Sequence, residues 1–288
     1  MADLPVAIIT DEFSQDFAEV CRTATELEIE GLELRTAWDK NVADMSDDEV
    51  DEIARLAKAS GRRVLGVASP VFKCTLPDGG EIDQRFEQDA FHSGHTWDDQ
   101  PRILARSVEI AERLGASTLR VFSFWRTVEP ESTYDRVVEA LEGAVDVAKP
   151  RGVKIGLENE HACNLATGAE VGPIFGRIAD PAFGLVWDPA NAYVAGEVPF
   201  PEGYSHVPAS RIIHVHAKDG VMNREADRMQ WGDLGAGDVD WKGQLAALIA
   251  DGYRGAFSLE THWEGPGGDK HAGSVICAKS LKRLVAEA

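Results

Sequence analysis

The chain repeats one hydrophobic pattern: a short apolar run, a polar loop, and a longer segment with apolar residues at three- and four-residue intervals. Short apolar runs are typical of buried strands, and longer periodic segments are typical of amphipathic helices. The runs predict eight strands, at Val6–Thr10, Gly31–Leu34, Val64–Ser69, Thr118–Phe122, Lys154–Glu158, Phe183–Asp188, Ile212–His216 and Ala256–Glu260.

The segments between the runs predict helices over Phe17–Leu27, Asp47–Ser60, Arg102–Leu114, Tyr134–Ala148, Val171–Ile178, Trp241–Ala250 and Lys270–Val285. Eight short strands that alternate with helices are typical of a parallel sheet closed into a (β/α)₈ barrel of the α/β class. A doubly wound open sheet is the alternative, but no GxGxxG motif follows the first run. We therefore predict one barrel domain over residues 1–288.

Two polar segments widen the spacing of the strands. The third and fourth strands start 54 residues apart, and the loop 70–100 lies between them; the segment Asp219–Asp238 separates the last two strands. Both segments follow strands, so in a barrel they project from the face formed by the carboxyl ends, where such folds carry their active sites. We predict that residues 70–100 form an inserted loop beside the site.

The composition adds a strong negative charge. The 288 residues include 29 Lys and Arg against 49 Asp and Glu, a net charge of −20. Phosphate backbones and anionic lipids repel such a chain, so we expect neither a nucleic acid nor a membrane as partner. The four cysteines form no CxxC pair and the first residues lack an export signal, which predicts reduced thiols and a cytoplasmic location.

Four neighbouring strands end in side chains that can bind a metal: Glu158, Asp188, His216 and Glu260. The carboxyl ends of barrel strands meet at one face, and three carboxylates gathered there repel one another unless a cation neutralises them. One divalent ion is the simplest neutraliser, and the mixed ligand set suits Mn²⁺, Mg²⁺, Co²⁺ or Zn²⁺. His214 alternates onto the same face, one layer deeper, and we expect it to support the site as a second-shell or core histidine.

The motifs around these residues resemble a known family. They are LENEH, WDPAN, HVHAKDG, GAGDVDW and SLETHW, which start at Leu157, Trp187, His214, Gly235 and Ser258. They resemble the sugar isomerase/epimerase superfamily with the xylose-isomerase-like TIM barrel. Within it they resemble the single-metal sugar phosphate isomerase/epimerase group, which includes the ketose 3-epimerases and the inositol-catabolism isomerases. The likeness covers the whole chain as a fold, and its specific motifs lie within Lys154–Glu264.

The resemblance implies a metal-dependent isomerase or epimerase that acts on a small sugar or related polyol ketone. It implies that Glu158 and Glu260 lie on opposite sides of the substrate as catalytic residues. One removes a proton beside a carbonyl, the metal stabilises the enediolate, and the other returns a proton. A dehydratase of the inosose or dehydroshikimate type and a non-catalytic barrel are the alternatives. The net charge of −20 disfavours a third, an apurinic endonuclease.

Two positions depart from the family pattern. Asn191 stands where many relatives have a histidine, and Asn164 stands where the ketose 3-epimerases have a glutamate, which disfavours a hexulose 3-epimerase. The predicted substrate contacts are Asn191, Glu160, His161, Lys73, Lys218 and Glu33. For Glu33 a rim salt bridge with Arg35 is the alternative, and for the two lysines a surface ion pair. Barrels of this kind commonly pack as dimers or tetramers, which leaves a homo-oligomer open.

Overall fold

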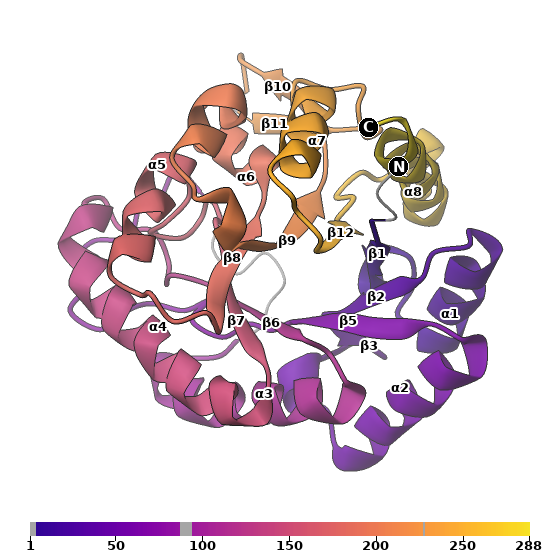
Figure 1. Cartoon of the computed structure of the whole chain (residues 1–288), viewed down its shortest axis with the longest axis horizontal. Helices are drawn as coiled ribbons and strands as arrows, with labels where there is room; N and C mark the ends of the chain where they lie inside the picture. Colours follow the sequence, from indigo (N-terminus) through magenta and orange to yellow (C-terminus); the bar gives the residue numbers. More distant parts are fainter. Residues whose placement is uncertain (1–3, 87–93, 227) are drawn as a thin grey trace.

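The computed structural model describes residues 4–86, 94–226 and 228–288, and in it eight parallel strands close into a barrel, as predicted (Figure 1). Around the barrel the order is β1, β12, β9, β8, β7, β6, β5 and β2, and β2 pairs with β1 to close it. The strands are β1 (Val6–Ile9), β2 (Gly31–Leu34), β5 (Arg63–Ala68), β6 (Thr118–Val121), β7 (Lys154–Glu158), β8 (Phe183–Trp187), β9 (Ile212–Ala217) and β12 (Ala256–Leu259).

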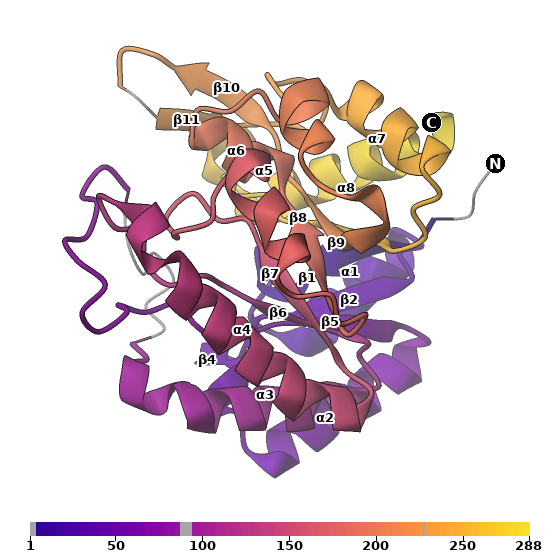
Figure 2. The same cartoon turned by 60° about the vertical axis from the view of Figure 1, so that its left-hand side comes forward.

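Helices surround the barrel, and the long ones turn apolar faces toward it (Figures 1 and 2). They are α1 (Phe17–Glu26), α2 (Asp47–Ser60), α3 (Gln100–Leu114), α4 (Tyr134–Ala148), α5 (Gly168–Val171), α6 (Pro189–Val194), α7 (Trp241–Ala250) and α8 (Lys270–Glu287). At the start of α2, Ser46 and Glu49 form a capping box, and Gly61 ends the helix in the left-handed conformation at φ 70°. Such local signals fix where the chain turns back toward the next strand.

The helix predicted over Val171–Ile178 is wrong in extent. The helix α5 ends at Val171, and residues Gly172–Gly176 form a 3₁₀ turn. Pro173 has no N–H to continue an α-helix, and in a continued helix its ring would clash with the carbonyl of Ala169, four residues earlier. The backbone at Gly172 also packs closely against the backbone at His206, because a Cβ on Gly172 would lie 2.3 Å from the carbonyl oxygen of His206.

Two hairpins were not predicted: β3 (Thr36–Ala37) with β4 (Lys40–Asn41), and β10 (Gly220–Asn223) with β11 (Arg228–Trp231). The second lies in the segment Asp219–Asp238 and projects from the body of the barrel (Figure 2). The buried carboxylate of Asp219 folds this segment back, because it accepts backbone hydrogen bonds from Gly220, Gly235, Gly237 and Val239. A Cβ on Gly237 would lie 2.2 Å from Asp219 Oδ1, so this turn requires glycine.

The segment predicted as an inserted loop, 70–100, includes residues 87–93, which lie outside the described residues. Its described part consists of turns, a bridge from Ile82 to Thr127, and a 3₁₀ helix at Trp97–Asp99 before α3. In the part of the chain that the structure describes, no helix combines the length and apolarity needed to cross a membrane.

Alternation along the strands separates an apolar layer from a polar barrel interior. Leu32 and Leu34 on β2 belong to the main hydrophobic cluster, while Glu33 between them is buried but charged. The same alternation places Arg120 between apolar neighbours on β6 and His214 and His216 between apolar neighbours on β9. Because strand side chains alternate between two faces, these polar groups share the inside of the barrel.

Candidate metal and substrate site

The four strand-end residues come together at the carboxyl ends of four consecutive barrel strands. Glu158 ends β7, Asp188 directly follows β8, His216 is the fifth residue of β9, and Glu260 directly follows β12. One potential ligand atom from each lies within 4.8 Å of the others, and all four residues are buried. The spacing brings three carboxylates and an imidazole to one point, which is the donor set that the sequence predicted for a divalent ion.

The way in which the Asp188 carboxylate is held suits a metal ligand. Its Oδ1 caps α6 by accepting from the backbone N–H of Asn191 at 2.9 Å, and Asn159 brackets its backbone with two hydrogen bonds. Its Oδ2 is buried and forms an ion pair with the Lys218 ammonium at 2.7 Å. This rigidly held oxygen already binds a cation of the protein, so a divalent ion would compete with Lys218 for it.

Three basic side chains contact the acids of the site, so the carboxylates are less in need of a metal than the sequence suggested. Arg120 contacts Glu158 at 2.8 Å, and Arg35 contacts Glu260 at 2.7 Å. Lys218 Nζ lies 2.5 Å from Glu260 Oε2 in addition to its contact with Asp188. The repulsion that the sequence analysis assigned to a divalent ion is therefore already offset by protein cations, and the case for a metal rests on the ligand geometry.

The charges of the cluster depend on these contacts. Burial raises the pKa of Asp188 despite the nearby Lys218. For Glu158, burial also favours the neutral acid, but His216 and Arg120 outweigh it and the pKa is lowered. Burial disfavours the charged form of Lys218, yet Asp188 and Glu260 raise its pKa. The site is thus a compact set of ion pairs.

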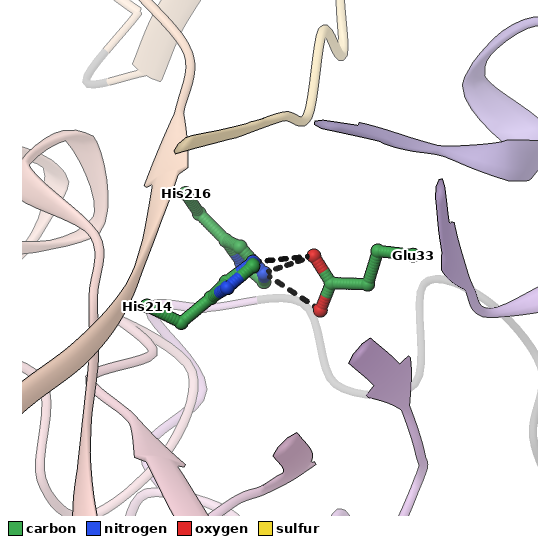
Figure 3. A group of neighbouring side chains, drawn as sticks. All are labelled: Glu33, His214 and His216. Carbon is green, nitrogen blue, oxygen red and sulfur yellow. Dashed lines mark hydrogen bonds and ion pairs between the residues drawn. The ribbon is translucent and has the colours of Figure 1, made fainter. Parts of the chain in front are cut away.

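His216 joins this set to a second group of buried side chains. Its Nδ1 lies 3.2 Å from Glu158 Oε1, and its Nε2 lies 3.1 Å from Glu33 Oε1 (Figure 3). Burial works against a charged imidazole, but Glu33 and Glu158 outweigh it and raise the pKa of His216 well above its ordinary value. His214 lies outside the four-ligand group, with its Nε2 2.9 Å from Glu33 Oε2.

The predicted substrate contacts lie in three places. At the mouth, His161 Nδ1 lies 3.0 Å from Asn191 Oδ1, and Asn191 donates to Glu158 at 3.1 Å. Glu160 completes this group, since its carboxylate lies 3.0 Å from His161 Nδ1 and 3.5 Å from Lys73 Nζ. Lys218 lies among the ligands, as described above. Glu33 lies deeper, with its carboxylate against the two histidines of β9.

The sequence analysis did not predict that two arginines would be buried beside the site. Arg35 is buried and forms ion pairs with Asp11, Glu12 and Glu260. It therefore lies within the site and not at its rim, where one alternative of the sequence analysis placed it. Arg120 is buried in the interior of β6. An arginine within an apolar strand run is a usable signal, because a guanidinium is rarely buried without an acidic partner.

Comparisons with known proteins agree with this fold. A profile of the xylose isomerase-like TIM barrel family matches residues 21–282. Similar solved structures include an IOLI protein with a bound zinc atom (TM-score 0.73, 18% identity, 99% of both chains covered). They also include 3-keto-D-glucoside 4-epimerase YcjR from E. coli (TM-score 0.67, 15% identity, 99% of this chain and 100% of that one). D-psicose 3-epimerase from Clostridium cellulolyticum H10, solved with D-tagatose, has a TM-score of 0.70 and 14% identity over 99% of both chains.

No curated protein matches the sequence. At these identities the solved structures establish a shared fold, and the chemistry has to be argued from the side chains of this chain.

Proposed function

This chain belongs to the xylose isomerase-like TIM barrel family, and on that premise we propose that it is a divalent-metal-dependent isomerase or epimerase of a small sugar or related polyol ketone. The observation that carries the proposal is the group Glu158, Asp188, His216 and Glu260, whose ligand atoms lie within 4.8 Å of one another. The Oδ2 of Asp188 supports it, because this buried oxygen already binds a cation, the Lys218 ammonium. Three carboxylates and one imidazole suit Mn²⁺, Mg²⁺, Co²⁺ or Zn²⁺, and we propose Mn²⁺ as the first ion to test.

Glu158 and Glu260 are the proposed catalytic residues. They come from β7 and from the residue after β12, which β8 and β9 separate around the barrel, so they approach the site from different sides. One carboxylate takes a proton from the carbon beside the carbonyl; the electrons of the C–H bond form a C=C bond, and the π electrons of the carbonyl move to its oxygen. In an epimerase the other carboxylate returns a proton to the opposite face of the same carbon, and the original carbonyl forms again. In an isomerase the proton returns to the former carbonyl carbon, and the hydroxyl proton of the first carbon passes to the former carbonyl oxygen as the new carbonyl forms.

The surrounding residues orient these groups. A divalent ion would supply a Lewis acid that makes the proton beside the carbonyl more acidic. Arg120 and Arg35 hold the two glutamates by charge-assisted hydrogen bonds. The mouth residues Glu160, His161 and Asn191 offer donors and acceptors that suit sugar hydroxyls.

The substrate class rests on two kinds of support. The similar structures include two epimerases whose names specify sugars, D-psicose and 3-keto-D-glucoside. The cations near the site face acids of the protein, an arrangement that favours a neutral polyol over a polyanion such as a nucleic acid. We also propose a cytoplasmic location, because all four cysteines are free and buried.

The test is an assay of ketoses and inososes in D₂O with Mn²⁺, followed by mass spectrometry. We expect product of unchanged formula that carries solvent deuterium, whereas loss of water identifies the dehydratase alternative. The variants Glu158→Gln and Glu260→Gln should lower the rate about 10²–10⁴-fold, the range typical of general acid–base groups. The exposed Glu264→Gln is the matched control and should retain the rate. Full activity of metal-free, chelator-treated protein contradicts the proposal.

A further inference from the structure

A buried carboxylate from the other side of the barrel holds the histidine of the proposed metal site. Glu33 lies on β2, and both histidines lie on β9; β1 and β12 separate these strands around the barrel. The three side chains point toward one another across the interior (Figure 3). Glu33 is 1% exposed, His214 3% and His216 0%, so solvent does not satisfy any of them.

The two ring nitrogens of His216 face different partners. Nδ1 lies 3.2 Å from Glu158 Oε1 and 3.7 Å from Glu260 Oε2, within the four-ligand group. Nε2 lies 3.1 Å and 3.2 Å from the two oxygens of Glu33. A neutral imidazole has one N–H and one lone pair, so a proton on Nε2 leaves the lone pair of Nδ1 for a cation.

We propose that Glu33 is a positioning residue: it accepts the Nε2 proton of His216 and thereby aims the Nδ1 lone pair at the divalent ion. The inference rests on the proposed function, and it assigns Glu33 a role other than substrate binding. A carboxylate behind a ligating histidine fixes the tautomer and ring orientation and makes the imidazole a stronger ligand. Glu33 needs no contact with the metal or the substrate for this role.

His214 and Ser258 complete the support. His214 Nε2 lies 2.9 Å from Glu33 Oε2 and 2.8 Å from the hydroxyl of Ser258. The second imidazole gives the buried carboxylate of Glu33 another donor, which offsets the cost of burying its charge. Glu33 is thereby held from two directions, and its orientation toward His216 is fixed.

The same three side chains also form a possible ligand group for a second ion, because potential ligand atoms of Glu33, His214 and His216 lie within 4.8 Å of one another. The four-residue group is the better ion site, because it offers three carboxylates and this group offers only one. Both Nε2 atoms lie 2.9–3.2 Å from Glu33 oxygens, as N–H donors to a carboxylate do. A second ion is therefore an outcome that the test must detect.

The test compares the affinity for Mn²⁺ of the wild type, Glu33→Gln and Glu264→Gln by competition with a chelator. We expect Glu33→Gln to bind Mn²⁺ about 10–100-fold more weakly. Glu264→Gln is the matched control, the same substitution at an exposed position, and its affinity should stay near that of the wild type. In a His216→Gln background, Glu33→Gln should cause little further loss, because its effect passes through the ring of His216.

A second readout does not depend on the folding of a variant. In the Zn²⁺-loaded wild type, ¹⁵N NMR of the histidine rings should show His216 protonated at Nε2 and not at Nδ1. Protonation at Nδ1 instead, equal Mn²⁺ affinity in Glu33→Gln, or two ions per wild-type chain with one lost in Glu33→Gln each overturns the positioning role. Absence of any Mn²⁺ binding by the wild type overturns the proposed function, so the two failures are distinguishable.

Discussion

The two halves of the barrel contribute different chemistry to one site. The half formed by β7, β8, β9 and β12 carries the proposed ligands at or just after its strand ends. The half formed by β1, β2, β5 and β6 carries Arg35, Arg120 and Glu33, and each of these contacts a ligand: Glu260, Glu158 and His216, respectively. The second half therefore sets the charge and orientation of ligands that it does not supply.

This division has a consequence for metal binding. Without an ion, Arg35 and Arg120 hold two of the acids, and Lys218 lies between Asp188 and Glu260. Lys218 would have to leave the two carboxylates for a divalent ion to bind there, whereas the arginines could stay in place. The arginines are then permanent supports, whereas Lys218 is a competitor of the metal.

The largest expected effect comes from removing a permanent support. Arg120→Met leaves the buried charge of Glu158 without its guanidinium partner, and we expect the metal-free protein to lose about 3–5 kcal/mol in free energy of unfolding. Urea denaturation measures the change. The double variant with Glu158→Gln should recover part of the loss, because no charge is then stranded. A single variant as stable as the wild type would show that the two halves are energetically independent.

A smaller effect is expected for Lys218, whose removal should strengthen metal binding. Lys218→Met removes the ammonium that the metal has to displace, and the affinity for Mn²⁺ should rise about a hundredfold, which is about 3 kcal/mol. Isothermal titration calorimetry measures the affinity. A lower affinity for Mn²⁺ in Lys218→Met would mean that Lys218, like Arg35 and Arg120, supports the metal site.

The smallest expected effect is a dependence of metal affinity on pH. The raised pKa of His216 means that the metal-free imidazole keeps its second proton above the ordinary range, and a ligating Nδ1 has to lose it. Mn²⁺ affinity should therefore increase with pH, by about tenfold per unit below that pKa, with a proton released on binding. Titrations in buffers of different ionisation enthalpy count the protons. No release at pH 6–7 would mean that His216 is already neutral.

The fold and the ligand group were accessible from the sequence for one reason. The eight apolar runs have strand length, and a closed parallel barrel brings every strand end to the same face. Residues that end neighbouring strands, such as Glu158 and Asp188, must then lie close together. The ion that they would bind remains a proposal.

The roles of Arg35 and Glu33 were harder to predict from the sequence, because they depend on contacts across the barrel interior. Arg35 and Glu260 are 225 positions apart, and Glu33 and His216 are 183 apart. Which inward side chains meet depends on strand tilt and register, neither of which the hydrophobic pattern specifies. Glu33 and Arg35 therefore resembled a rim pair, although their side chains contact different ligands. The helix α5 was misjudged for a local reason, the proline at position 173.

The central claim is that one divalent ion binds to Glu158, Asp188, His216 and Glu260. The most direct measurement is metal content by mass spectrometry after equilibration with Mn²⁺ and removal of free ion, for the wild type, Asp188→Asn and Glu160→Gln. Glu160 is the matched control, a buried acid of the mouth outside the ligand group. We predict about one ion per chain in the wild type and in Glu160→Gln, and almost none in Asp188→Asn. No ion in the wild type, or equal content in all three proteins, would contradict the claim.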